Sequence, residues 1–375
     1  MTLTITQITP DELDDFIRVP FGLYADLPHW IPPLMQERRD ALKVGGTPFM
    51  KRADTAMWIA HRAGRPVGRI SAQIDPVSQE KTPGVGHFGL LAAENDASVF
   101  DLLLSTAEEW LRGRGMTRVL GPMNLSINEE CGLLVDGFDT PPMMMMPYDP
   151  PYLAPHFAAR GYTKAKDLLA YLIDTTTELP EAARRIVERP LPDNVKIRPL
   201  DTADYAGEVR RLVAIFNDAW ADNWGFIPFD AAEIDLMAKE MRPLIDKRLV
   251  WFAEVDGAAA AFVVCLPNLN EAIADLDGSL LPLGWAKLLW RIKVKGLTTG
   301  RVPLMGVRRE MTGTLLGGIL PFLLIDRLRR AVRETRMRRI EMSWVLDDNR
   351  PMRTLAEAMC GPAYKTYRLF ERDLA

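Results

Sequence analysis

One stretch of the chain combines residue types that suit hydrogen bonding to a ligand and proton transfer. It runs from Gly121 to Gly132 and lies between two strand-like runs, 117–120 and 133–135. Its glycines and proline fix an unusual backbone path, and its amides and carboxylates offer groups that a plain connection does not need: Asn124, Asn128, Glu129 and Glu130. A carboxylate can accept a proton from a neighbouring group, so Glu130 is the first candidate for a general base, with Glu129 beside it. The alternative is a polar turn that covers the end of a sheet.

Three other residues could take part in the same chemistry. His87 lies on a predicted strand, 86–91, beside the strand that leads into the loop, although a lone histidine next to glycines is more often structural. Glu310 follows a strand in the second half of the chain and could instead pair with a neighbouring arginine. Cys131 has no histidine near it in sequence, which disfavours a covalent intermediate, so we expect direct transfer.

Composition and cysteine usage exclude several classes of protein. A net charge of −4 across 375 residues gives no general attraction to nucleic acid, so no nucleic-acid partner is expected. The three cysteines and four histidines form neither a CxxC pair nor a metal-spaced cluster, which predicts reduced thiols in a cytoplasmic protein and no metal. The N-terminal segment turns acidic at Asp11 and Glu12, unlike a signal peptide, and the longest apolar run, 315–325, is too short to span a bilayer.

The order of predicted elements occurs twice along the chain. Each half is expected to contain a strand, a helix, a hairpin, a further strand and then alternating helices and strands. The hairpins are predicted at 56–74 and 249–266, and each is followed by a long helix, at 97–114 and 313–336. The segment 179–194 contains three prolines with charged residues between them, which is typical of a boundary. We therefore expect two domains, 1–178 and 195–375, joined by the linker 179–194.

The end of the second half resembles the GNAT acyltransferases. The residues that carry this resemblance are the strand 340–346, the helix that follows Asn349 and the closing run 364–367. Upstream, the run Val307 to Thr314 stands where that family places its pyrophosphate loop, and backbone N–H groups at a helix N-terminus suit a diphosphate. The resemblance implies acyl-CoA as co-substrate and the following contacts for it: Arg308, Arg309, Met311, Thr312, Gly313, Thr314 and Asn349.

The chain departs from the pattern of the family in three places. The first glycine position of the loop holds Met311 and only the second holds a glycine, which implies a looser approach to the diphosphate. The helix position where many members carry a tyrosine general acid reads Ala356 in the second half and Phe157 in the first. The first half has the acidic run 92–96 in place of the loop, and its carboxylates would repel a diphosphate. Coenzyme A is therefore expected in the second half.

Across nearly its whole length the chain resembles the tandem-GNAT proteins that include bacterial ceramide synthases. The resemblance is carried by 121–139, 150–162 and 217–226. It implies the α/β (α+β) class, with two tandem GNAT-like domains that are each a twisted mixed sheet flanked by helices. It also implies transfer of an acyl group from acyl-CoA to an amine. Together with the apolar segment 280–295, the resemblance favours a long-chain acyl group and a sphingoid base or another long-chain amine as acceptor. Glu130 is then expected to accept the proton of the ammonium. The residues expected to contact the amine are Asn124, Asn128, Tyr148, Asn217, Trp220, Asn223 and Trp224.

Other interpretations of the same features stay open. The stretch 217–226 could be a helix end with packed aromatic side chains. The methionines 143–146 are more typical of an ordinary core than of a lipid site. The segment 280–295 mixes tryptophans with lysines, so it could pack between the domains or lie on the inner membrane as a peripheral helix. The alternative functions are acetylation of a small polar amine and binding of acyl-CoA or lipid without catalysis.

Overall fold

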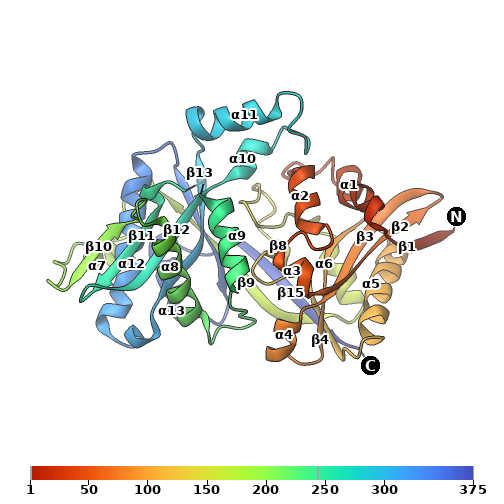
Figure 1. Cartoon of the computed structure of the whole chain (residues 1–375), viewed down its shortest axis with the longest axis horizontal. Helices are drawn as coiled ribbons and strands as arrows, with labels where there is room; N and C mark the ends of the chain where they lie inside the picture. Colours follow the sequence, from red (N-terminus) through yellow and green to blue (C-terminus); the bar gives the residue numbers. More distant parts are fainter. Residues whose placement is uncertain (1, 243–244, 375) are drawn as a thin grey trace. The chain divides into compact units, whose positions relative to one another are not determined.

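The computed structural model describes residues 2–242 and 245–374 (Figure 1). The chain divides into two compact units, and neither is continuous in sequence. Unit 1 comprises Met1–Leu168, Ile273–Leu288 and Lys365–Ala375, and unit 2 comprises Leu169–Ala272 and Leu289–Tyr364. Each unit combines a mixed sheet with helices, as the α/β class predicts.

Unit 1 is built on a sheet with the strand order β1-β2-β3-β4-β5-β15, and β8 also pairs with β15. Its strands pair antiparallel except for β4 and β5, which are parallel. The elements of this part of the chain are β1 (Leu3–Gln7), α1 (Leu13–Leu23), α2 (Met35–Leu42), α3 (Pro48–Arg52), β2 (Asp54–Arg62), β3 (Arg65–Ile74), α4 (Pro76–Lys81), β4 (Val85–Ala93), α5 (Ala97–Arg112), β5 (Arg118–Gly121), β6 (Met123–Asn124), β7 (Glu130–Cys131), β8 (Leu133–Asp136), α6 (Leu153–Ala159), β9 (Thr163–Asp174) and β15 (Lys365–Asp373).

Unit 2 is built on a sheet with the strand order β10-β11-β12-β13-β14-β9, to which β9 contributes its residues from Leu169 onward. Here β13 and β14 form the parallel pair, and the pairs from β10 to β13 are antiparallel. The elements are α7 (Glu181–Val187), β10 (Val195–Pro199), α8 (Tyr205–Trp220), α9 (Ala231–Met241), β11 (Val250–Val255), β12 (Ala258–Pro267), α10 (Leu269–Ile273), β13 (Thr299–Val307), α12 (Leu315–Arg333), β14 (Arg339–Leu346) and α13 (Arg350–Cys360). The helix α11 (Gly284–Trp290), which lies between α10 and β13 in sequence, belongs mostly to unit 1. Both units thus repeat one order of elements, as predicted.

Alternation along the strands gives the sheet of unit 1 two apolar faces. On β2, Trp58 and Ala60 belong to the cluster that packs against α5, whereas Met57 and Ile59 belong to the cluster that packs against α1, α2 and α3. The helix α5 begins where Asp96 accepts a hydrogen bond from the backbone N–H of Ser98. This sheet is therefore covered by helices on both sides.

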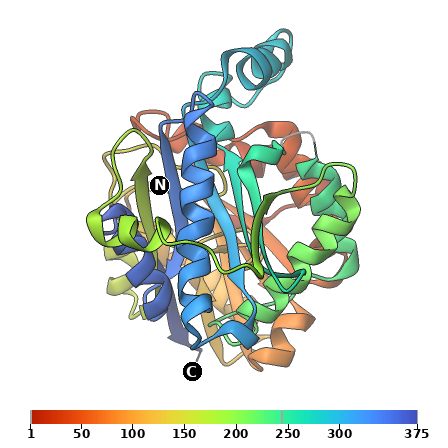
Figure 2. The ribbon, with the colours of Figure 1, turned by 90° about the vertical axis from the view of Figure 1, so that its left-hand side faces the viewer.

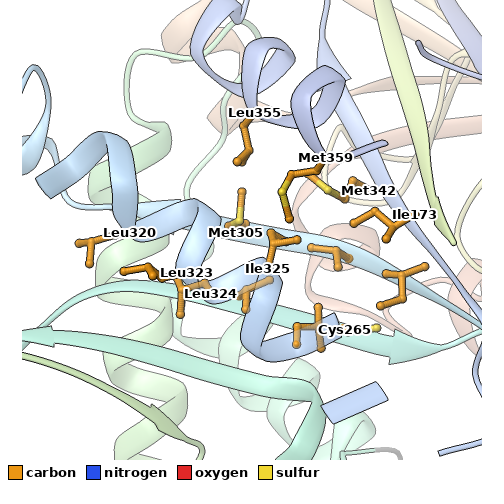
Figure 3. Packing of buried hydrophobic residues seen from close by; sticks show 14 of the residues in the cluster. Ile173, Cys265, Met305, Leu320, Leu323, Leu324, Ile325, Met342, Leu355 and Met359 are labelled. Carbon is orange, nitrogen blue, oxygen red and sulfur yellow. The ribbon is translucent and has the colours of Figure 1, made fainter. Parts of the chain in front are cut away.

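In unit 2 the long helix α12 lies along one face of the sheet (Figure 2). Its apolar residues, among them Leu320, Leu323 and Leu324, pack in one cluster with strand residues such as Met305 and Met342 (Figure 3). Thr314 caps this helix, because its hydroxyl accepts a hydrogen bond from the backbone N–H of Gly317. The N-terminus of α12 is thereby held at the end of β13, after a short turn.

The compact units depart from the continuous halves 1–178 and 195–375. Residues 169–178 belong to unit 2 and residues 273–288 to unit 1. The last strand of the chain, β15, belongs to unit 1 because it pairs with β5 and β8. The segment 179–194 is part of unit 2, because it contains α7 and buries Leu179 and Ala183 in the core of that unit. Prolines and charges mark a boundary in composition, but strand pairing and burial decide where the chain packs.

Candidate active site

The two parallel strands of unit 2 part before they end. The register of β13 and β14 runs from Thr299↔Arg339 to Val302↔Met342, although β13 continues to Val307 and β14 to Leu346. Beyond the last pair, the facing backbone groups of the two strands are not bonded to each other as a ladder. A wedge of this kind can accept an extended ligand that bonds to the free strand edges.

The loop at the open end of this wedge presents backbone donors. A turn at Arg309–Met311 leads to Gly313, which has a φ of +78°, and then to Thr314 and the first turn of α12. Among the described residues, the backbone N–H groups of Gly313, Leu315 and Leu316 have no hydrogen-bond acceptor. A left-handed glycine followed by free N–H groups at a helix N-terminus is a suitable cradle for an anion, so the geometry fits a diphosphate despite Met311.

Side chains around this loop already have partners within unit 2. Arg308 donates to the carbonyl oxygen of Ala259 at 2.9 Å, and Arg309 forms ion pairs with Asp218 and Asp222. Asn349 caps α13, because its side chain accepts a hydrogen bond from the N–H of Met352. Thr312 donates its N–H to the carbonyl oxygen of Arg309. Their roles in binding CoA stay predictions, and the free backbone N–H groups are the donors that the loop itself offers.

Aromatic side chains from α8 and β14 line the unpaired part of the strands. Trp220 donates its indole N–H to the carbonyl oxygen of Met305, and its ring meets the ring of Trp344 edge to face at 5.8 Å. One turn earlier on α8, the side-chain oxygen of Asn217 is buried and lacks a hydrogen-bond partner among the described residues. Asn223 donates its N–H to the carbonyl oxygen of Trp220. The predicted residues Asn217, Trp220 and Asn223 therefore gather at one end of α8, and Trp224 follows directly.

In unit 1 the corresponding wedge is filled by the chain itself. The pairing of β4 and β5 ends at His87↔Leu120, and the segment after β5 then turns back against β4. The side-chain oxygen of Asn124 accepts the N–H of Leu90 at 2.7 Å, and Gln73 donates to the carbonyl oxygen of Met123 at 2.7 Å. The bond with Leu90 occupies the edge of β4, and Gln73 holds the loop from the neighbouring strand β3.

The acidic run of unit 1 is neutralised within that unit. Arg62 forms ion pairs with Glu94 and Asp96, and Arg65 forms one with Glu94. The carboxylates that we expected to repel a diphosphate are therefore paired with arginines. The loop backbone, rather than these carboxylates, lies against β4.

Substitution of Gly89 tests this filled wedge. A Cβ atom at this position would lie 1.7 Å from the carbonyl oxygen of Met123, so Gly89→Ala must displace backbone. We expect the free energy of unfolding to fall by about 3 kcal/mol, measured by urea denaturation. The control is Gly22→Ala in α1, where no atom lies within 4 Å of the new methyl group and helix propensity predicts up to about 1 kcal/mol of stabilisation. Equal stability of the two variants would contradict the contact.

The loop of unit 1 holds Glu130 in a charged cluster. Arg38, from α2, donates to one oxygen of Glu130 at 2.5 Å, and Asn124 donates to the other at 3.2 Å. Burial opposes ionisation of this carboxyl, but the charge and hydrogen bond of Arg38, together with Asn124, outweigh it and hold the pKa of Glu130 below its ordinary value. Glu130 is therefore a fixed carboxylate and a weak proton acceptor.

A second carboxyl group near Glu130 has the opposite character. Asp149 is half-buried and accepts the backbone N–H of Leu134. Burial and, to a smaller extent, the negative charge of Glu130 raise the pKa of Asp149 to about 7, against the opposing effect of the hydrogen bond from Leu134. Two carboxyl groups whose pKa values are driven apart are a common arrangement for acid-base catalysis.

The other predicted residues of unit 1 have mainly structural partners. Burial lowers the pKa of His87 to about 4, so its ring is neutral near pH 7 and a poor base. The hydroxyl of Tyr148 donates to the carbonyl oxygen of Phe138 at 2.8 Å. Asn128 donates its N–H to the hydroxyl oxygen of Ser126, and Glu129 donates its N–H to the carbonyl oxygen of the same residue. Cys131 is buried.

Sequence reasoning missed Arg38 and Asp149. Arg38 lies on α2, which has no strong apolar period, and it reaches a loop 92 positions away in sequence. Asp149 stands between Tyr148 and a proline, so it reads as a turn residue. The signal that could have indicated Asp149 is its position three residues after the methionine run 143–146. In this run Met143, Met144 and Met146 are buried, as expected for core residues.

Two searches of the described residues bear on other classes of site. Among residues 2–242 and 245–374, no three His, Cys, Asp or Glu side chains come together as a group that could hold a metal ion. In the same residues, no helix combines the length and apolarity that crossing a membrane would require.

Comparison with known proteins decides the family. No protein-family model matches the chain. A protein of Caulobacter vibrioides named bacterial ceramide synthase is 52% identical over 368 residues, which cover 98% of this chain and 96% of that protein. Protein YghO of Escherichia coli is 42% identical over 373 residues, which cover 99% and 95% of the two chains. The chain belongs to the family of the bacterial ceramide synthase.

Solved structures show the fold of this family member. A tandem GNAT protein from the clavulanic acid biosynthesis pathway aligns over 100% of this chain and 99% of its own, with a TM-score of 0.57 and 15% identity. A GCN5-related N-acetyltransferase from Sphaerobacter thermophilus aligns over 99% and 96%, with a TM-score of 0.52 and 12% identity. The tandem GNAT fold predicted from the sequence is confirmed, and the chain is an acyltransferase.

Proposed function

We propose that the chain transfers a long-chain acyl group from acyl-CoA to the amine of a sphingoid base. The observation that carries the proposal is the 52% identity, over nearly the whole length, to a protein named bacterial ceramide synthase. A ceramide is the amide of a fatty acid and a sphingoid base, so its synthesis requires an acyl donor and a long-chain amine. The parted strands and free N–H groups of unit 2 support the same chemistry.

The direct test is an assay of the purified protein. Labelled acyl-CoA of several chain lengths is incubated with sphinganine or 3-oxosphinganine, and we expect amide and free CoA to form in equal amounts. Absence of amide at every chain length would overturn the proposal. Preference for acetyl-CoA and a small polar amine would point instead to an acetyltransferase.

Unit 2 is proposed to bind the acyl-CoA, with the diphosphate at the N–H groups of Gly313, Leu315 and Leu316 and the pantetheine arm between β13 and β14. The amide groups of that arm could bond to the unpaired strand edges. Since the wedge of unit 1 is filled by its own chain, we expect one CoA per polypeptide. Isothermal titration with a non-transferable acyl-CoA thioether gives the stoichiometry, and a value of two would contradict the assignment.

Unit 1 is proposed to act on the amine. An attacking ammonium must lose a proton, and Asp149 is suited to accept it because its pKa lies at about 7. Glu130, the base expected from the sequence, would hold the ammonium and, through its charge, raise the pKa of Asp149.

The segment 280–295 is proposed to touch an anionic membrane surface. Trp285 and Trp290 are 52% and 53% exposed, and further exposed apolar residues follow the same segment: Leu281, Leu283, Leu289 and Val294. Basic residues alternate with them, namely Lys287, Arg291, Lys293 and Lys295. Apolar side chains among lysines and arginines are typical of helices that lie in a membrane interface.

Vesicle flotation tests the membrane contact. The protein is mixed with vesicles of phosphatidylcholine and phosphatidylglycerol, and Trp285→Ser combined with Trp290→Ser is expected to lower the bound fraction roughly tenfold or more, because two large apolar side chains are lost. Val44→Ser is the control, since this residue is exposed but lies outside the segment. Equal flotation of all three proteins would remove the segment from membrane binding.

A further inference from the structure

We propose that Tyr364 and Glu341 form a proton shuttle in unit 2, which takes a proton from the attacking nitrogen and returns one to the departing sulfur. The inference rests on the proposed acyl transfer. It adds a proton donor to the site, because the helix position where many GNAT members carry a tyrosine general acid cannot supply one in this chain. That position is Ala356, which is fully buried in the core of unit 2.

Four side chains make a continuous hydrogen-bonded chain. Arg301 donates to the hydroxyl oxygen of Ser343 at 2.8 Å, Ser343 donates to one oxygen of Glu341, and Tyr364 donates to the other. Arg301 also lies 4.0 Å from the Glu341 carboxylate. A carboxyl group that is removed from water is tolerated when it is hydrogen-bonded and faces a positive charge, as Glu341 does.

Burial singles out Tyr364 as the outer member of this chain. Arg301, Glu341 and Ser343 are 4%, 0% and 3% exposed, whereas Tyr364 is only partly buried. The buried carboxylate can therefore exchange a proton with a ligand through the phenol hydroxyl. A salt bridge that served stability alone would not need a tyrosine hydroxyl at its outer end.

The position of the cluster matches the place where the thioester must react. Arg301 and Glu341 face each other in the register, next to the last pair, Val302↔Met342, and Ser343 is the first residue of β14 beyond that pair. The cluster thus marks the closed end of the wedge. From there to the anion-binding loop after Val307, the strand extends about 17 Å at ~3.3 Å per residue, a length comparable to the pantetheine arm of CoA.

The face of the sheet agrees with this placement. On β14, Ile340 and Met342 belong to the core beneath α12, so Glu341 and Ser343 point to the opposite face by alternation. That opposite face is covered by α8, whose Trp220 contacts β13 and Trp344. The shuttle therefore lies on the side of the wedge where the predicted amine-binding residues of α8 gather.

The proton balance of the step closes without another reactant. The amine nitrogen forms a bond to the thioester carbon, and the carbon–sulfur bond breaks with its electron pair leaving on sulfur. The nitrogen then gives a proton to the Tyr364–Glu341 pair, and the pair gives one to the sulfur. Tyr364 and Glu341 end in their initial protonation states, and amide and free CoA are the products. The proton that the ammonium loses before attack is a separate one, assigned above to Asp149.

Kinetics of two variants test the shuttle. We expect Tyr364→Phe and Glu341→Gln each to lower kcat about 10²-fold, with the Kd for a non-transferable acyl-CoA thioether unchanged. Because both residues serve one relay, the double variant should be no slower than the slower single variant. The control is Tyr171→Phe, which removes another tyrosine–glutamate contact of unit 2, with Glu357, on the opposite face of the sheet. It should keep the full kcat.

The outcomes separate this inference from the proposed function. If the wild-type protein forms no amide, the proposed function fails and the shuttle fails with it. If Tyr364→Phe forms amide at the wild-type rate, or if the two substitutions reduce kcat independently, only the shuttle is overturned. Glu341→Gln keeps the shape of the buried side chain. Its kcat therefore tests the shuttle even where the loss of the Tyr364 hydroxyl impairs folding.

Discussion

Asp149→Asn is expected to lower kcat about 10²- to 10⁴-fold, because an asparagine cannot accept the proton that the ammonium loses. In the wild-type protein, kcat/KM should rise with pH through about 7 and then level off, since Asp149 must be ionised to act and burial, with the charge of Glu130, raises its pKa to about 7. The variant should lose this acid limb. Rates measured across the pH range with saturating acyl-CoA give both quantities.

Glu130→Gln is the informative partner of this variant. Removal of the Glu130 charge takes away a repulsion from Asp149 and leaves Arg38 without its carboxylate, so the pKa of Asp149 should fall. The acid limb should move to lower pH while activity persists in reduced form. If Glu130→Gln instead abolished the limb and Asp149→Asn retained it, Glu130 would be the base, as expected from the sequence.

The pH dependence of stability shows whether Asp149→Asn loses activity through catalysis or through unfolding. The pKa of Asp149 in the folded protein is raised above its ordinary value of 3.8, so its carboxyl group favours the folded state below that value and loses this contribution as pH rises through about 7. Asparagine does not titrate, so Asp149→Asn should be at least as stable as the wild type at pH 8. Loss of activity at that pH would then not arise from unfolding.

Local sequence signals predicted the elements of each unit well. The hairpin β2–β3, the helix α5 and the strand β14 all follow from apolar periods that one segment carries by itself. The loop from Gly121 to Gly132 was also identified from its residue types. Its main task within unit 1 is visible only in three dimensions, where it fills the space between two parting strands.

Strand pairing between distant parts of the chain could not be predicted from the sequence. No local pattern indicates that β15 pairs with β5, because the two strands are far apart in sequence and each would suit a sheet of either unit. The same holds for the site. Alternation along β14 indicates only that Glu341 and Ser343 share a face of the sheet, and their buried hydrogen-bonded chain is visible only through the contacts with Arg301 and Tyr364.

Leu315→Pro is expected to weaken acyl-CoA binding roughly 10- to 100-fold with little effect on folding. Proline removes one of the three free N–H groups at the loop, and a hydrogen bond to a charged group contributes about 1.5–3 kcal/mol. The backbone already suits proline, because Leu315 is the first residue of α12 and Thr314 before it has extended angles, φ −85° and ψ 154°. Titration with a non-transferable acyl-CoA thioether measures the change.

The matched control is Leu315→Ala, which removes the same exposed side chain but keeps the N–H group. If the leucine side chain rather than the N–H contacts the ligand, both variants should weaken binding equally. If neither variant changes the Kd, the diphosphate does not lie at this helix N-terminus. A loss confined to the proline variant would show that this family member binds CoA through its backbone N–H groups. A backbone donor does not depend on the side chain beside it. The loop could then function with Met311 at the position where the GNAT pattern has a glycine.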